Sequence, residues 1–319
     1  MGNNIRKMFF AFLFLYVAAF VFGQSAAEPS LKAVEMSITA YQNDAMAFAV
    51  KDGFNKTKSL RVPREDPSID KLTFEINAFL GDRNNGGYIK NKGAKIDYAK
   101  ELPKVKVILA GEIHFFNSEE QVEGILKSFK NPYLASEFFS TDMEDEIEVY
   151  RLTKDDFYIP SYAPELKELR AKLIKLAGNS HIIALENGRM YEPKKIAEKI
   201  NEADDYIMAS LIASSSFEFH KTVVGLGYRN GFWLDRLSDI IKDDNTIVVY
   251  GGMGHMLYGA ESGSLSDRLA AENIETAVIF LISKQRLDVR VAQGLGPGLT
   301  LVKMPEPEKY GFDFMVIHD

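Results

Sequence analysis

Short apolar runs of strand length alternate along the chain with segments whose apolar residues recur at helical spacing. The runs predict strands at 105–110, 133–139, 181–187, 246–251, 276–282 and 312–317. Helical spacing predicts helices at 28–51, 118–129, 141–150, 165–177, 193–224, 228–241 and 264–271, and segment 72–80 fits a helix or a strand. This alternation predicts an α/β fold with a mainly parallel central sheet flanked by helices.

Several of these strands end in ionisable residues. The run 105–116 reads VKVILAGEIHFF and passes from apolar residues into Gly111, Glu112 and His114. The run 246–256 reads TIVVYGGMGHM and repeats the pattern, with His255 three residues after a glycine. Glu137 and Glu186 lie near the ends of two further strands. Since ligands bind at the carboxyl ends of the strands in open parallel sheets, we expect one polar site at that edge.

Glycine and proline mark the expected interruptions. Segment 81–93 (GDRNNGGYIKNKG) and the Gly/Pro-rich segment 294–307 are typical of turns and loops. Segment 225–227 (GLG) favours a break before the helix that contains Arg229.

Imidazole and carboxylate side chains at the predicted edge allow two kinds of chemistry. They are the usual ligands of a catalytic divalent ion in a chain without cysteine, and they are also the usual general acid and base. Arg229 could hold a carboxylate or stabilise an oxyanion. The plain alternative for a single histidine after a strand is a loop or capping role, but two matched glycine-linked histidines favour a shared site.

The first 23 residues have the features of a secretory signal peptide. Arg6 and Lys7 precede an apolar stretch over 8–23, and small residues follow it. The alternative is a retained N-terminal anchor, because the stretch is only slightly short for a membrane span. We expect cleavage and an exported protein, periplasmic or extracellular, with no transmembrane segment left after signal removal.

Composition narrows the function further. Without Arg6 and Lys7 the chain has 36 basic and 45 acidic residues, a net charge of −9, which argues against nucleic acid as a partner. The absence of cysteine excludes disulfides and thiolate chemistry. We therefore expect a small-molecule or peptide substrate, and the sequence leaves the oligomeric state open.

The chain resembles the broad superfamily that joins erythromycin esterases, the haem-uptake ChaN proteins, the TraB/PrgY/GumN proteins and the Tiki proteases. The matching pieces begin at Val105 and reach the C-terminus, about two thirds of the chain. They are the strand followed by Gly111-Glu112-Ile113-His114, the strand-end Glu137, the segment Arg229-Asn230 with Trp233, the strand with Gly252-x-x-His255, and the closing strand that begins at Phe312-Asp313. The resulting division is a signal peptide at 1–23, a helical and loop region at 24–104 packing on the main domain, and the α/β domain at 105–319.

The resemblance implies a site built from Glu112, His114, Glu137, Arg229 and His255. Tiki-like members imply a divalent metal, for which His114, His255 and Glu137 are the candidate ligands. The erythromycin esterase branch implies water activation without a metal, and ChaN-like members imply haem binding.

Two functions follow as expectations. The first is an exported hydrolase, an esterase or metallopeptidase, in which His114 with Glu112 activates water while His255 and Arg229 stabilise the developing charge. The alternative is a haem- or iron-binding uptake protein, in which the sequence does not choose the iron ligand among its 14 tyrosines. A remnant site that only binds a partner is a third possibility.

Overall fold

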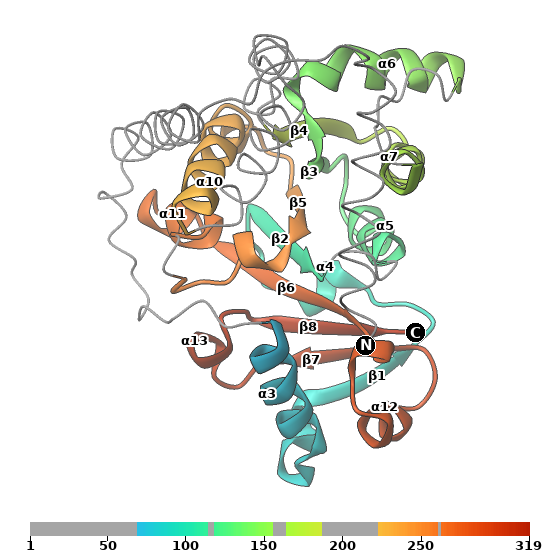
Figure 1. The fold of residues 1–319 in the computed structure, drawn as a ribbon, viewed down its shortest axis with the longest axis vertical. Helices are drawn as coiled ribbons and strands as arrows, with labels where there is room; N and C mark the ends of the chain where they lie inside the picture. The colour runs from blue at the N-terminus through green and yellow to red at the C-terminus, as the bar shows by residue number, and fades with distance from the viewer. Residues whose placement is uncertain (1–68, 114–117, 156–163, 187–222, 261–262) are drawn as a thin grey trace, which may run out of the picture. The chain divides into compact units, whose positions relative to one another are not determined.

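The computed structural model describes residues 69–113, 118–155, 164–186, 223–260 and 263–319, which all fall in the same one of the chain's two units. Their centre is an eight-stranded sheet of order β1-β7-β8-β6-β2-β5-β3-β4 (Figure 1). Six neighbouring strands, from β8 to β4, pair in parallel, whereas β7 pairs antiparallel with both β8 and β1. The expected α/β fold with a mainly parallel sheet is therefore confirmed.

The strands have the following bounds: β1 (Ile89–Gly93), β2 (Val107–Glu112), β3 (Tyr133–Ser140), β4 (His181–Glu186), β5 (Ile247–Gly252), β6 (Thr276–Ser283), β7 (Leu299–Lys303) and β8 (Phe314–His318). The central strands β2 and β5 are buried along their whole length, which explains why their sequences are continuous apolar runs rather than alternating ones. The chain leaves β2 toward β3 and β4 on one side and later crosses back to β6 on the other. The order of strands thus reverses at β2 and β5, and the carboxyl ends at such a point form the usual ligand-binding crevice.

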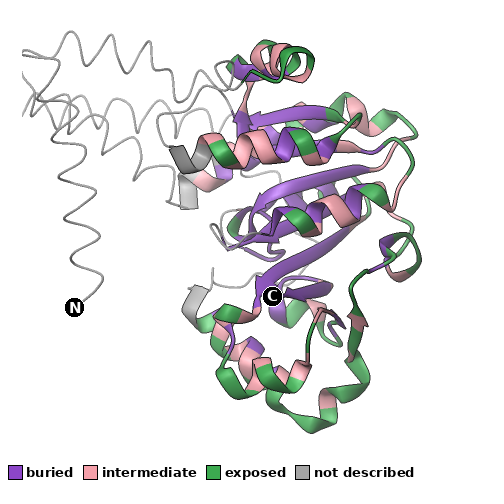
Figure 2. Ribbon diagram, turned by 90° about the vertical axis from the view of Figure 1, so that its right-hand side faces the viewer, coloured by how far each residue is buried: buried purple, intermediate pink, exposed green. Residues whose placement is uncertain are grey.

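Helices cover both faces of the sheet: α3 (Ile69–Gly81), α4 (Tyr98–Glu101), α5 (Glu119–Lys127), α6 (Glu144–Thr153), α7 (Pro164–Ala177), α10 (Val223–Ser238), α11 (Leu265–Ala271), α12 (Val289–Leu295) and α13 (Pro307–Tyr310). Short 3-10 turns connect them: η1 (Arg83–Tyr88), η2 (Thr141–Met143), η4 (Ile240–Lys242), η5 (Met253–His255) and η6 (Lys284–Arg286). Helices α10, α11 and α3 bury apolar side chains against one face, and α5 and α7 against the other (Figure 1). The burial pattern shows the central strands enclosed between these layers, with exposed residues on the outer helical surfaces, on the connections and on β1 (Figure 2).

Two segments expected to be loops contain strands. Residues 81–93 form η1 and the edge strand β1, and the segment 294–307 contains β7, which pairs with both β1 and β8. The prediction of plain loops was wrong, and for β1 the reason is that the strand is mostly exposed, so it has no apolar run to reveal it. Its pairing partner is supplied by β7, more than 200 residues away in the chain. The sheet of the main domain thus includes a strand that precedes Val105.

Helix α10 begins earlier than expected and runs through the Gly-Leu-Gly segment. Gly227 is buried, and its carbonyl oxygen accepts a hydrogen bond of 2.8 Å from Arg268 Nη2 of α11. This contact stabilises the helix where its local propensity is poor, so tertiary packing overrides the break. No helix among the described residues is both long and apolar enough to cross a membrane.

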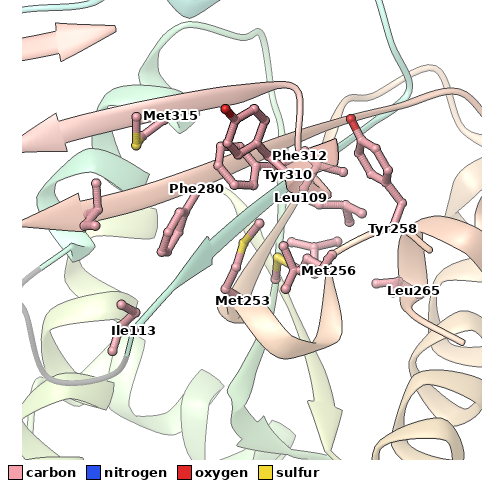
Figure 3. Close-up of a cluster of buried hydrophobic side chains, with 14 of the residues drawn as sticks. Leu109, Ile113, Met253, Met256, Tyr258, Leu265, Phe280, Tyr310, Phe312 and Met315 are labelled. Carbon is pink, nitrogen blue, oxygen red and sulfur yellow. The ribbon is translucent and has the colours of Figure 1, made fainter. Parts of the chain in front are cut away.

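A buried apolar cluster supports the turn that follows β5. Met253 and Met256 pack with Leu109, Phe280 and Phe312 beneath this turn (Figure 3). Gly111 of β2 makes the close packing possible, because a Cβ atom there would lie 2.9 Å from the Met253 Cα atom. The cluster thereby fixes the position of η5, the turn that contains His255.

Candidate functional site

His255 has its ring orientation set by helix α10. Its Nδ1 atom lies 2.6 Å from Asn230 Oδ1, while the Asn230 amide nitrogen donates to the Gly263 carbonyl at 3.2 Å. Since the amide nitrogen of Asn230 faces a carbonyl, its oxygen faces the imidazole, and Nδ1 must be the donor. In the neutral ring, Nε2 is then the basic nitrogen.

One side chain of α10 joins His255 to an ion pair. The Trp233 indole stacks on the His255 ring with centroids 4.2 Å apart, and its Nε1 donates to Glu186 Oε1 at 3.1 Å. Arg229 donates to the same carboxylate through Nε at 3.0 Å and Nη2 at 2.5 Å. The side chains of Arg229 and Glu186 are only 13% and 6% exposed, so this is a buried ion pair. The carboxylate that Arg229 holds in the structure is that of the protein's own Glu186.

Burial is the main cause of the shifted pKa of Glu186. Desolvation raises the pKa of its carboxyl group above the ordinary value of 4.5, and the nearby Glu137 carboxylate raises it further. The charge and hydrogen bonds of Arg229 lower the pKa but do not cancel the cost of burial. The ion pair therefore stabilises the carboxylate only in part.

Glu137 lies over the end of β5. Its Oε2 atom accepts the Gly252 N–H at 2.8 Å and lies 3.8 Å from His255 Nε2. A Cβ atom on Gly251 would come within 2.5 Å of that oxygen, so only glycine leaves room for the carboxylate. The two glycines after the β5 apolar run thus have separate roles: Gly251 provides space and Gly252 provides a donor.

Glu112 has a different set of neighbours. The Tyr250 hydroxyl donates to Glu112 Oε2 at 2.7 Å. By alternation along their strands, both side chains point to the face covered by α5 and α7, whereas Glu137 lies above Gly251 on the α10 face. Burial and the Glu112 charge raise the pKa of Tyr250 well above its ordinary value, which keeps the phenol protonated as a donor.

The strand ends therefore come together as expected, but not as one group. Glu137 and His255 lie side by side, with Arg229 connected to them through Trp233. Glu112 is hydrogen-bonded to Tyr250, and His114 lies outside the described residues. The expected partnership between Glu112 and His114 therefore stays a prediction.

The sequence assigned no site role to two residues of α10, although both belong to the segment that carries the resemblance. Asn230 and Trp233 are one helical turn apart, and both contact His255; their spacing of three residues was the available signal. His318, to which the sequence assigned no role, is buried near the C-terminal end of the chain, with Nε2 3.1 Å from the Ser118 hydroxyl. Ser118 is the N-cap residue of α5, but its side chain makes no capping bond.

The arrangement suits proton transfer at a buried edge. It combines a base of defined tautomer, a neighbouring carboxylate and an ion pair that contacts the base through Trp233. Within the described parts of the chain, no three or more His, Cys, Asp or Glu residues are grouped so that they could hold a metal ion.

Comparison with known proteins identifies no family. No protein-family profile matches the sequence, and no curated protein matches it. Solved structures that resemble it include ChaN of Campylobacter jejuni, described as binding haem cofacially, with 16% identity and a TM-score of 0.39 over 70% of this chain and 91% of that one. A Bacillus cereus protein has 10% identity and a TM-score of 0.39 over 79% of this chain and 98% of that one. Likeness at this level establishes neither a family nor a function.

Proposed function

We propose that this chain is a hydrolase that activates water with His255 and Glu137 to cleave an ester or peptide bond. The hydrogen bond from His255 Nδ1 to Asn230 supports this proposal most directly, because it makes Nε2 the basic nitrogen of a buried imidazole. The sequence-based expectation gave the base role to His114 with Glu112. Because Glu112 is hydrogen-bonded to Tyr250, we assign the base role to His255, with Glu137 beside it.

The proposed reaction needs one proton relay. His255 Nε2 takes a proton from water as the water oxygen attacks the carbonyl carbon. Glu137, 3.8 Å away, stabilises the imidazolium that forms. The bond from the carbonyl carbon to the leaving oxygen or nitrogen then breaks as the same nitrogen returns the proton to that atom. An acid and an alcohol or amine are released, and His255 is neutral again.

Arg229 takes a supporting role in this proposal. Its guanidinium is bound to Glu186 and lies 5.8 Å from the centre of the Trp233 ring. The pair therefore holds the indole against His255 and limits rotation of the imidazole. This replaces the expected role of Arg229 in stabilising an oxyanion.

Glu137 and His255 also fit part of a divalent-ion site. One imidazole and one carboxylate whose facing atoms are 3.8 Å apart are a common pair of zinc ligands. The Nδ1–H bond to Asn230 is the outer contact that metal-bound histidines usually make. Glu137, His255 and His114 would be the ligands, and a bound ion would lower the pKa of the attacking water.

Two substitutions at the site and one control test the proposal. We expect His255→Ala and Glu137→Gln to lower hydrolysis of an ester and peptide panel by about 100- to 10,000-fold. His181→Ala is the matched control, because that histidine is exposed at the opposite, amino end of β4. Wild-type rates in both site variants would overturn the proposal.

Elemental analysis and an absorption spectrum of the same preparation separate the cofactor alternatives. A stoichiometric divalent ion that is lost in His255→Ala would add the metal to the proposal. A Soret band in the wild type would replace the hydrolase with the haem-binding alternative.

We also propose that the protein is exported, on the basis of the charged and apolar pattern of residues 1–23. Expression in a secreting host followed by mass measurement tests this. A protein that retains these residues in the cytoplasm would contradict it.

A further inference from the structure

Strand β3 carries a bulge that includes Glu137, one of the two residues that activate water in the proposed function. Its pairing with β4 passes from Ser136 opposite Ala184 to Ser140 opposite Glu186. Three residues of β3 thus face one residue of β4, and pairing with β5 ends at Ser136. Main-chain groups that leave the ladder at a bulge must find other partners when they are buried.

Phe138, the middle residue of the bulge, has both of its main-chain polar groups bound by side chains. Its N–H donates to Ser136 Oγ at 3.3 Å, and its carbonyl oxygen accepts from Arg170 Nε at 2.7 Å. Ser136 is fully buried in β3 itself, whereas Arg170 reaches the bulge from α7. Burial lowers the pKa of Arg170 to about 10, still high enough to keep the guanidinium charged at neutral pH.

The position of Phe138 determines the position of Glu137. The two side chains point to opposite faces, since the Phe138 ring packs 5.3 Å from the Tyr250 ring while Glu137 lies above Gly251. Rotation of the main chain at Phe138 would move the Glu137 carboxylate away from the Gly252 N–H and from His255 Nε2. The bond from Arg170 opposes that rotation.

We propose that Arg170 is a positioning residue for Glu137, acting through the Phe138 carbonyl from the opposite face of the sheet. Only the kinetic consequence of this inference rests on the proposed function. Its structural consequence is a fixed hydrogen bond between Gly252 N–H and Glu137.

The Gly252 amide resonance reports this consequence without a substrate. A charged acceptor moves an amide proton downfield, so Glu137→Gln gives the reference shift for a weakened bond. Arg170→Met keeps the length of the side-chain stem and removes the donors. We expect it to move the Gly252 resonance at least half as far as Glu137→Gln does.

Lys172→Met is the matched control, because Lys172 lies on the same helix but contacts Glu119 of α5 at 3.3 Å. We expect it to leave the resonance unchanged. A folded Arg170→Met variant with the wild-type Gly252 resonance overturns the inference. If Arg170→Met fails to fold, Arg170→Lys keeps the positive charge but has a methylene group in place of the Nε donor to the Phe138 carbonyl, and it is judged by the same criterion.

Kinetics distinguish the two proposals. We expect Arg170→Met to lower kcat by about 100-fold with little change in KM, as a misplacement near 1 Å does. A shifted resonance in a protein that hydrolyses nothing would keep the positioning inference and overturn the proposed function. The opposite result is hydrolysis that depends on His255, with an unchanged rate and an unmoved Gly252 resonance in Arg170→Met. It would keep the proposed function and overturn the positioning inference.

Discussion

Gly251 offers a sharp test of how the site is built. A Cβ atom at this position would lie 2.5 Å from Glu137 Oε2 and 3.0 Å from its Cδ atom. In Gly251→Ala the carboxylate must therefore swing away. It then loses the 2.8 Å hydrogen bond from Gly252 and its place beside His255.

The expected effect on stability is small. A hydrogen bond to a charged group contributes roughly 1.5–3 kcal/mol, and replacing glycine by alanine returns roughly 0.4–1 kcal/mol through the unfolded chain. We expect a net loss of about 1–2 kcal/mol in the free energy of unfolding. The expected effect on activity is much larger, about 100-fold in kcat, because the displaced carboxylate can no longer stabilise the imidazolium.

Gly111 is the matched comparison, since it lies directly opposite Gly251 in the pairing of β2 with β5. A Cβ atom there would lie 2.9 Å from the main chain of Met253 and 3.1 Å from Met256 Sδ. Because main chain cannot swing aside, we expect Gly111→Ala to cost about 3 kcal/mol, at the upper end of overpacking effects.

Urea denaturation and initial rates on the best ester of the panel measure both variants. The reasoning predicts that Gly251→Ala loses activity more than stability and that Gly111→Ala loses more stability than Gly251→Ala. Wild-type kcat in Gly251→Ala, or a smaller loss of stability in Gly111→Ala than in Gly251→Ala, would refute it.

Three further substitutions test single contacts. We expect Asn230→Ala to lower kcat about 10- to 100-fold with KM nearly unchanged, because the tautomer of His255 is no longer set; a loss confined to KM would contradict this. The raised pKa of Glu186 means that its contribution to stability is complete below pH 4.5 and is lost as pH rises through the folded value. The urea midpoint should therefore fall less steeply with rising pH in Glu186→Gln than in wild type. Equal pH dependence of the midpoint in both proteins would contradict this contribution of Glu186. Tyr250→Phe removes the donor to Glu112 and should lower the free energy of unfolding by about 1–3 kcal/mol, whereas unchanged stability would show that this bond contributes nothing.

The partners of the site residues could not be predicted from their own neighbourhoods. Glu112 and Tyr250 are 138 residues apart, and Arg229 and Glu186 are 43 apart. Nothing in the GEIH segment indicates that its glutamate binds a tyrosine of another strand. Such pairs exist only after the sheet has brought distant strand ends to one edge.

The same limit explains the errors in the secondary structure. Strand β1 has too few buried residues to produce an apolar run, and it forms because β7 provides a main-chain ladder. Helix α10 continues through two glycines because Arg268 of α11 binds the Gly227 carbonyl. Both elements depend on contacts made by another part of the chain.

The sequence by itself determined the α/β alternation, the central strands and the strand ends that carry Glu137 and His255, because buried parallel strands are continuous apolar runs and their ends must be polar. The tertiary structure alone decided that Glu137 faces His255 across Gly251, while Glu112 points to the other face with Tyr250. Local pattern specifies which residues enter a strand. Register, bulges and the packing of α7 and α10 specify where each side chain at its end will point.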